Sequence, residues 1–237
     1  KYVSLKIGVR ESTKTGYRTV LRILEKEPFG HLPIDKVRVS DAKTWLIKLQ
    51  QEDGRGYSSI HCIRGVVRPA FQMAVEDELL RKNPFCFELH TVLVNDGKTR
   101  DAITRKQERD FLQFVKEDNH YRKYYEGFYI LLNTGLRISE FCALTPADID
   151  FKNRCIHVTG QLVRPSNMIT CIEPTKTAAG IRDVPMSDEV VECFKNVMKN
   201  RKQPKVEPII DGKAGFLSLI RMVGLWLQCI GNITSSM

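Results

Sequence analysis

The sequence lacks several features that would place it in a specialised class of protein. No uninterrupted apolar run approaches the ~20 residues of a membrane span, which excludes a transmembrane protein. The first ten residues, KYVSLKIGVR, contain no apolar signal core, so we expect no secretion signal. The seven cysteines are odd in number and no two have C-x-x-C spacing. We therefore expect no disulfide framework and no zinc site, and a reducing cytoplasm as the location.

Acidic residues are the minority among the charges. The 37 Lys and Arg residues outnumber the 28 Asp and Glu residues and give a net charge of +9. This excess favours a polyanionic partner, because neutralising phosphates releases their counterions. On charge alone, a basic protein without such a partner is an equal alternative. Hydrophobic residues at 42% and charged residues at 27% are ordinary for a globular protein and exclude collagen, coiled-coil rods and mostly disordered chains.

Apolar spacing predicts helices in the first hundred residues. One helical face runs through 15–27, a second helix follows Ser40 as N-cap, and a long third helix follows Ser58 and stops near Asn83-Pro84. Three or four amphipathic helices with short connections make a small bundle. Helical spacing is lost after residue 88, and turn chemistry around Asp96 predicts a linker over 91–103.

A second domain is predicted to begin at the capping box Thr104-x-x-Gln107. A helix ends at Gly135, and the period then changes to that of strands over 155–159, 168–173 and 181–186. Ser187 caps a last amphipathic helix. The predicted fold class is mainly α with a small antiparallel β-sheet, built as a helical domain followed by an α+β domain.

The segment Asn133–Glu140, N-T-G-L-R-I-S-E, places an arginine directly after a glycine helix stop. The amides at the start of the next helix can supplement the Arg137 guanidinium as an anion site. Glu140, one turn further on, can hold that guanidinium. From physics alone, a helix–turn–helix connection with a surface ion pair is the stronger interpretation.

The second candidate is Lys176 in the segment E-P-T-K-T-A-A-G-I-R, which we predict to be a turn between two strands. A hairpin tip can carry an ammonium group into a phosphate-lined groove, where the lysine can protonate a leaving oxygen. Taken alone, an ordinary exposed hairpin lysine explains this segment better.

Together the two segments resemble the tyrosine recombinase (phage-integrase) family. The runs T-G-L-R-I-S-E, L-T-P-A-D-I-D and T-K-T-A-A-G-I-R-D-V-P-M are similar to the catalytic-domain pattern of that family. Similarity extends to about Leu217. The runs L-I-K-L-Q-Q-E-D-G-R, R-G-V-V-R-P-A-F-Q-M-A-V and A-I-T-R-K-Q-E-R most resemble integrases of Gram-positive conjugative transposons.

The resemblance implies a clamp around double-stranded DNA. Residues 1–90 would be a helical core-binding (SAM-like) domain, 91–103 the linker, and 104–217 an incomplete catalytic domain. In the implied chemistry, a tyrosine attacks the scissile phosphate and forms a 3′-phosphotyrosine, with no metal or other cofactor. Arg137 matches the first arginine that stabilises the phosphoryl charge, Glu140 its supporting carboxylate, and Lys176 the acid that protonates the 5′-oxygen.

The rest of the family's active site is not found. The family has an H-x-x-R motif, a further His or Trp, and the nucleophilic tyrosine after the lysine. All five histidines precede Lys176 and all seven tyrosines precede Arg137. We therefore expect an integrase-family chain of a mobile element that is inactive as it stands. The alternative function is a non-catalytic DNA-binding remnant or regulator that occupies attachment or transposon-end sites.

Residues 218–237 match nothing in the family, and we expect an out-of-frame or otherwise truncated C-terminus. Codons for 219–223 can be chosen so that a shifted frame reads Asp-Lys-Asn-Gly, as in the family at this place. A divergent or trimmed end is the alternative. Relatives assemble as tetramers through the C-terminal segment, so this chain is expected to be monomeric.

Basic and hydroxyl side chains in two places are the predicted DNA contacts. The start of the long helix supplies helix-terminal amides and one basic side, both suited to phosphates. The linker and the residues just after it supply a second basic group. These candidates are Arg55, Ser58, Ser59, Arg64 and Arg68, followed by Lys98, Arg100, Arg105 and Lys106. A solvated basic face is the alternative.

Two acidic residues and one histidine have structural interpretations. Asp148 and Asp150, two residues apart after Pro146, are expected to be a cap and a surface charge. A metal-dependent nuclease is a weak rival, since no histidine or third acid adjoins them in the sequence. His157, in a short strand, is expected to be packed rather than to bind a ligand.

Overall fold

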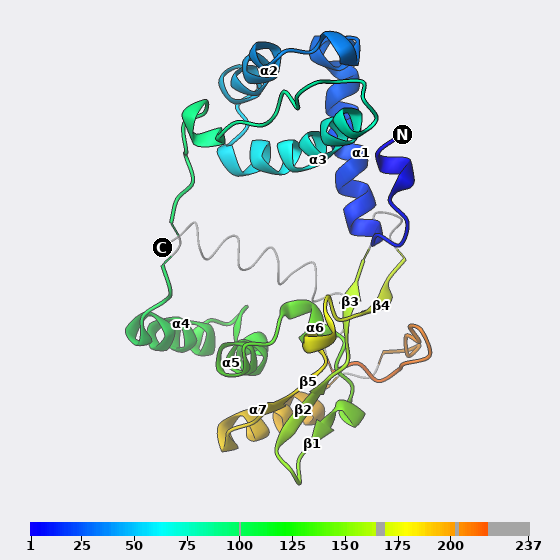
Figure 1. Ribbon diagram of the computed structural model, residues 1–237. Helices are drawn as coiled ribbons and strands as arrows, with labels where there is room; N and C mark the ends of the chain where they lie inside the picture. The colour runs from blue at the N-terminus through cyan, green and yellow to red at the C-terminus, as the bar shows by residue number, and fades with distance from the viewer. Residues whose placement is uncertain (100, 165–168, 202–203, 218–237) are drawn as a thin grey trace. The chain divides into compact units, whose positions relative to one another are not determined.

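The computed structural model describes residues 1–99, 101–164, 169–201 and 204–217. Two compact units, Lys1–Asp101 and Ala102–Met237, divide the chain (Figure 1). The first is helical, and the second combines helices with small antiparallel sheets. The predicted fold class, mainly α with a small antiparallel sheet component, is therefore confirmed. Within the described ranges, none of the helices has the length and apolar character needed to cross a membrane.

In the part of the first unit that the structure describes, there are three α-helices and four 3₁₀ turns. The α-helices are α1 (Glu11–Lys26), α2 (Val39–Gln51) and α3 (Tyr57–Glu76). The 3₁₀ turns are η1 (Val3–Leu5), η2 (Pro28–His31), η3 (Ile34–Lys36) and η4 (Leu89–Thr91). The three amphipathic helices predicted for this half are present.

Two of the predicted helix caps are wrong. α2 begins before Ser40, because the Asp41 carboxylate accepts a hydrogen bond from the Arg38 amide at 2.9 Å and satisfies the helix start there. α3 begins before Ser58, because the Tyr57 amide donates to the Asp96 carboxylate at 2.8 Å. A tertiary partner therefore replaces the local serine cap in α3.

The predicted end of the long helix is also too late. α3 ends at Glu76, and Glu78 then adopts a left-handed backbone conformation with φ of 59°. The amides of Leu79 and Leu80 both donate to the Ala74 carbonyl, which turns the chain back at once. The proline effect at Pro84 therefore acts on a segment that is no longer helical.

Aromatic rings form the centre of the first unit. Phe29 stacks on Trp45 with ring centroids 4.5 Å apart and planes 4° from parallel. Phe85, which is fully buried, meets both rings edge-on at 5.9 and 6.2 Å. Edge-to-face and offset contacts are the favoured geometries for aromatic pairs. These contacts join η2, α2 and the segment after α3 into one core.

The first part of the predicted linker packs against this core. Leu93 is buried, and the Gln50 side chain both donates to the Val94 carbonyl and accepts from the Val94 amide, at 2.7 and 3.1 Å. Asp96 holds the start of α3 as described above. Residues up to Asp96 are therefore tied to the first unit, whereas Lys98 is exposed.

The second unit begins with helices. α4 (Arg105–Glu117) starts at the predicted capping box, in which the Thr104 hydroxyl accepts from the Gln107 amide. After η5 (Arg122–Tyr124), α5 (Tyr125–Thr134) ends at Gly135, whose φ of 64° is the left-handed value that favours glycine. The remaining helical elements are α6 (Ile138–Cys142), η6 (Pro146–Asp148), η7 (Ala178–Gly180) and α7 (Asp188–Lys199).

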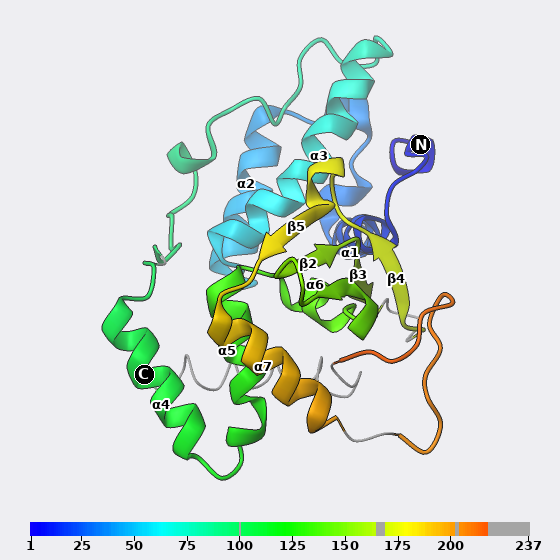
Figure 2. The same ribbon diagram turned by 90° about the horizontal axis from the view of Figure 1, so that it is seen from below.

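Among the described residues of the second unit, five short strands form two separate antiparallel sheets. β1 (Ile149–Asp150), β2 (Cys155–Val158) and β5 (Arg182–Pro185) form one sheet in the order β1-β2-β5. β3 (Gly160–Val163) pairs with β4 (Cys171–Pro174) in the other. The predicted hairpin around Lys176 is therefore wrong. β4 and β5 pair with different partners, so the Lys176 segment crosses from one sheet to the other (Figure 2).

Two glycines of the first unit provide a matched test of this packing. An added Cβ at Gly30 would lie 2.0 Å from the Leu24 carbonyl oxygen, whereas one at the exposed, helical Gly16 would meet nothing within 4 Å. We expect Gly30→Ala to lower the free energy of unfolding by about 2 kcal/mol through overpacking. Gly16→Ala should raise it by about 0.5–1 kcal/mol. Urea unfolding followed by circular dichroism measures both, and equal effects would contradict the packing of η2 on α1.

Candidate active site

A buried carboxylate lies at the centre of the candidate site. Only 2% of the Glu140 side chain is exposed, and it is clamped from two sides. Arg137 donates from its backbone amide at 3.0 Å and from Nη1 at 2.7 Å. Arg182 donates from Nη1 at 3.2 Å and from Nη2 at 2.9 Å. Oε1 therefore accepts from both guanidinium groups, and Oε2 accepts from the Arg182 guanidinium and the Arg137 amide. Hydrogen bonds to both oxygens from charged partners are what a buried carboxylate needs to stay ionised.

Local structure positions each member of this cluster. The left-handed Gly135 stops α5, and Arg137 then occupies the N-cap position of α6. Glu140 is the third residue of α6, so its side chain reaches back to the Arg137 amide. Phe141 and Cys142 are buried and fix the helix in the core. The contact between Arg137 and Glu140 that the sequence predicts is present.

Arg182 was missed by the sequence analysis. It shares a face of β5 with the buried Val184, because side chains two apart on a strand point the same way. An arginine on the inward face requires a buried acid as partner, and Glu140 supplies it. The alternation R-D-V-P was the signal that could have found Arg182, but the identity of its partner was not readable from the chain.

The pKa of Glu140 reflects this arrangement. Burial by itself raises the pKa, but the hydrogen bonds from Arg182 and Arg137 outweigh burial and lower the pKa from 4.5 to about 2. The same contact with Glu140 raises the pKa of Arg182. Glu140 is therefore ionised at neutral pH and acts as a fixed anchor for two cations.

Arg137 keeps much of its guanidinium available. Its side chain is 66% exposed, compared with 31% for Arg182. One Nη of Arg137 is held by Glu140, while the exposed remainder faces solvent. A guanidinium held at one edge and open at the other is suited to bind an anion with little loss of side-chain entropy.

Lys176 is exposed and lies on the crossing segment next to the buried Thr175. Gly180 packs on Thr175 so closely that an added Cβ would lie 2.6 Å from the threonine Cβ. The Gly180 carbonyl in turn accepts from Arg182 Nη1 at 3.1 Å. Successive contacts through Thr175 and Gly180 therefore tie the Lys176 segment to the Arg182–Glu140 pair.

The predicted DNA-contacting residues fall into four cases. Exposed side chains, free to meet a ligand from solvent, are Ser58, Ser59, Arg68, Lys98, Arg105 and Lys106. Arg55 is half-buried and lies 3.8 Å from the Asp53 carboxylate. Arg64 is occupied within the first unit, and Arg100 lies outside the described residues.

Arg64 holds the segment after α3. Its Nη2 donates to the carbonyls of Phe85 and Phe87 at 2.8 and 2.5 Å, and its guanidinium lies 5.3 Å from the Phe87 ring centre. Burial lowers the pKa of Arg64. Arg64 and Arg68 therefore differ in their surroundings, although both were predicted to lie on one exposed basic face.

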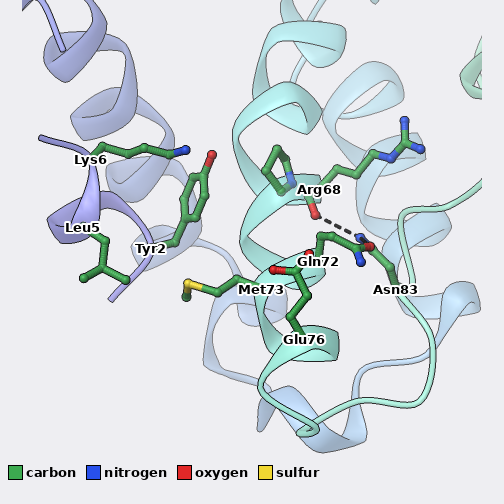
Figure 3. Close-up of a pocket in the computed structure, with 9 residues that line it drawn as sticks. Tyr2, Leu5, Lys6, Arg68, Gln72, Met73, Glu76 and Asn83 are labelled. Atoms are coloured by element: carbon green, nitrogen blue, oxygen red, sulfur yellow. Dashed lines mark hydrogen bonds between the residues drawn. The ribbon is translucent and has the colours of Figure 1, made fainter. Parts of the chain in front are cut away.

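A groove of about 690 Å³ lies elsewhere in the first unit, between η1 and α3 (Figure 3). Tyr2 and Lys6 line one side of it and Met73 the other. The Asn83 side-chain amide donates to the Arg68 carbonyl at 2.9 Å, while the Arg68 guanidinium points away from Tyr2. Of the residues that the sequence predicts to be functional, Arg68 alone lines this groove.

The two aspartates after Pro146 have the expected structural roles. Asp148 accepts from the Thr145 amide and hydroxyl, both at 2.8 Å, and caps η6. Asp150 accepts from the amides of Lys152 and Asn153 at 2.9 Å and forms the turn before β2. His157 differs from its expected packed state, because its side chain is 41% exposed.

Comparison with known proteins gives consistent matches. The model of the phage integrase family matches residues 101–216. The transposase from transposon Tn916 of Enterococcus faecalis is 42% identical over 214 residues, as is the transposase from transposon Tn1545 of Streptococcus pneumoniae. Each alignment covers 90% of this chain and 52% of the relative, so the chain spans about half the length of these curated relatives.

Solved structures extend the match to both units. The Tn1549 transposon integrase in complex with circular intermediate DNA superposes with a TM-score of 0.89 at 38% identity, over 99% of this chain and 76% of that chain. The same integrase with transposon right end DNA gives a TM-score of 0.87 at 42% identity, over 93% and 69%. Lambda integrase bound to DNA, at 15% identity, shares the fold with a TM-score of 0.54.

The Glu140 cluster should produce a specific pH dependence of stability. The folded pKa of Glu140 is about 2, below its ordinary value of 4.5. The contribution of the ionised Glu140 to the free energy of unfolding is therefore complete above about pH 4.5 and is lost as the pH falls from 4.5 towards 2. Glu140→Gln should lower the free energy of unfolding at neutral pH by about 3 kcal/mol and remove this part of the pH dependence. Urea unfolding between pH 7 and pH 3 measures both effects.

Glu192→Gln is the matched control, because Glu192 is an exposed carboxylate paired with Lys195 on the same unit. It should change the free energy of unfolding by less than about 0.5 kcal/mol. Equal losses in the two variants would contradict the anchoring role of Glu140.

A second matched pair separates the two arginines of α3. Arg64→Ala removes two charge-assisted hydrogen bonds to backbone carbonyls and should cost about 2–3 kcal/mol of unfolding free energy. Arg68→Ala, at an exposed position, should cost less than about 0.5 kcal/mol. Urea unfolding of both variants checks this difference, and a stable Arg64→Ala protein would be the contrary result.

Proposed function

This chain belongs to the phage integrase family of tyrosine recombinases, and we propose that it carries the phosphate-binding part of a site-specific DNA recombinase of a mobile element. The observation that supports this most directly is that the buried Glu140 carboxylate pairs with both Arg137 and Arg182, while the Arg137 side chain stays largely exposed. The proposed ligand is double-stranded DNA at attachment or transposon-end sites.

The proposed role of Arg137 is to bind a non-bridging oxygen of the scissile phosphate. In strand transfer by this family, a tyrosine oxygen forms a bond to phosphorus while the bond from phosphorus to the 5′-oxygen breaks. Negative charge builds on the phosphoryl oxygens, and a guanidinium already held in position stabilises that charge without reorganising. Glu140 is a positioning residue in this scheme, since it acts through Arg137 and Arg182.

The proposed role of Lys176 is to give a proton to the departing 5′-oxygen. Lys176 is exposed and follows Thr175, which packs against Gly180, and the Gly180 carbonyl accepts a hydrogen bond from Arg182. These contacts connect the Lys176 segment to Arg182. A flexible side chain on such a segment can follow the leaving oxygen as the bond breaks. The proton leaves as the charge on that oxygen develops, so the step is balanced without a metal.

We further propose that the 237-residue chain does not cleave DNA. Each tyrosine in the sequence precedes Arg137, and none follows Lys176. Burial raises the pKa of Tyr125 and of Tyr129 on α5, the opposite of what an activated nucleophile needs. The function left to this chain is to bind DNA without forming the covalent intermediate, as a remnant or regulator at such sites.

Charge and family membership support a DNA partner. The chain has a net charge of +9, and the Tn1549 relatives were solved in complex with DNA. The proposed contacts include the first turn of α3, where Ser58 and Ser59 are exposed, and the exposed Lys98, Arg105 and Lys106. We expect Arg64 to contribute by stabilising the first unit. In the absence of DNA we expect the chain to be a monomer, which sedimentation can measure.

The decisive experiment incubates the 237-residue chain with a nicked transposon-end duplex and resolves the products under denaturing conditions. We expect non-covalent binding in a gel-shift assay and no covalent protein–DNA adduct. Arg137→Ala should weaken binding and reduce the slope of log affinity against log salt by about one, because one phosphate contact is lost.

Arg154→Ala is the matched control, since Arg154 is similarly exposed, is paired with Asp188, and carries the same charge. It should leave the salt slope unchanged. A covalent adduct would contradict the assignment of the chain as non-cleaving. Equal effects of the two arginine variants would contradict the phosphate site, and failure to bind any duplex would contradict the function as a whole.

A further inference from the structure

Four polar side chains share the outer face of the β1-β2-β5 sheet. Cross-strand pairing sets Asp150 opposite Cys155 and His157 opposite Asp183. Ile156, between Cys155 and His157, is fully buried in the core, so its two neighbours point to the other face. These pairings place two carboxylates, a thiol and an imidazole side by side on a face that the phosphate-binding residues do not use.

The potential ligand atoms of Asp150, Cys155 and His157 lie within 4.8 Å of one another. The Cys155 sulfur is 3.9 Å from His157 Nε2. In a tetrahedral zinc site, bonds of about 2.0–2.3 Å place neighbouring ligand atoms about 3.5 Å apart. The observed spacing of up to 4.8 Å therefore needs a closure of at most about 1.3 Å, which side-chain rotation can supply.

The histidine already has the orientation that a metal ligand needs. Its Nδ1 lies 2.6 Å from the Asp183 carboxylate, which accepts a hydrogen bond from Nδ1–H and so leaves the lone pair on Nε2, the nitrogen that faces the Cys155 sulfur. Metal-binding histidines usually make this carboxylate contact with their second nitrogen. Asp150 is oriented as well, because Asn153 and Lys152 hold its carboxylate from the turn side.

We propose that Asp150, Cys155 and His157 bind one divalent transition metal ion of the zinc type, with Asp183 as the positioning residue. Mixed sulfur, nitrogen and oxygen ligands favour zinc over magnesium or calcium. A water molecule takes the fourth position. Since Asp150 belongs to β1 and the other two ligands to β2, the ion clamps this hairpin; the role is structural, and the phosphate chemistry proposed above does not depend on it.

Local electrostatics are consistent with a cation at this place. The carboxylates of Asp150 and Asp183 lie opposite Cys155 and His157 in the strand pairing, so two negative charges adjoin the thiol and the imidazole. A divalent cation offsets this concentration of negative charge and displaces the thiol proton. The sequence analysis dismissed a zinc site because C-x-x-C spacing is absent, whereas here strand pairing brings the ligands together.

The test is a titration of the full 237-residue chain with Co²⁺, which reports thiolate ligation through its charge-transfer absorption. We expect saturation at one ion per chain, tetrahedral-type visible bands, and displacement by Zn²⁺. Cys155→Ser should abolish the charge-transfer band. Cys62→Ser, at an exposed cysteine of the first unit, is the matched control and should leave the band intact.

Asp183→Asn tests the positioning role separately. It should weaken metal binding by about 10- to 100-fold while keeping the thiolate band, because the three ligands remain. Circular dichroism verifies that each variant is folded, and the wild-type titration decides the matter without any variant. Absence of a saturable band, or a band that survives Cys155→Ser, would overturn the proposal, whatever the outcome of the DNA-binding assays.

Discussion

Glu140 is a carboxylate removed almost completely from solvent, and it stays ionised because two arginines satisfy it. One arginine precedes it by one helical turn, and the other comes from a strand 42 residues further along the chain. Burying a charge without such partners would cost several kcal/mol, so the packing of α6 and the position of β5 depend on each other. Because Glu140 also binds Arg137 Nη1, the same contacts fix the orientation of the exposed Arg137 guanidinium.

The surroundings of each arginine decide what it does. Arg137 and Arg64 both donate to oxygen acceptors, but Arg137 meets a charged carboxylate and keeps an open edge, whereas Arg64 meets two neutral carbonyls and is covered by Phe87. The guanidinium of Arg137 therefore stays available to a ligand, whereas that of Arg64 is used to join two segments of the first unit. A basic residue count cannot separate these cases, because both contribute one charge to the same total.

The two faces of the three-stranded sheet differ in chemistry. Successive side chains of β5 point to opposite faces, so neighbouring residues of this strand belong to different clusters. Arg182 and Val184 face inward towards Glu140 and the core, while Asp183 faces outward to His157. Strand alternation therefore lets adjacent residues serve an anion-binding cluster and a separate polar cluster. The two proposals drawn from this unit rest on opposite faces and are independent.

Much of this protein was readable from the chain. Periodicity and capping chemistry are local, so the three helices of the first unit, the Thr104 box, the Gly135 stop and the contact of Arg137 with Glu140 were all predicted. The family followed from motifs whose spacing is specific. Local rules failed where a distant partner intervened, as when Asp96 replaced Ser58 at the start of α3.

The pairing of the strands was the main feature that could not be predicted from the sequence. Short strands of similar composition can pair in several ways, and the choice depends on which apolar faces meet in the core. That choice separated β4 from β5, turned a predicted hairpin into a crossing, and brought Arg182 to Glu140 and His157 to Asp183. The sequence by itself determined the elements and the candidate residues; tertiary structure decided their partners, because burial and pairing energies are shared among residues far apart in the chain.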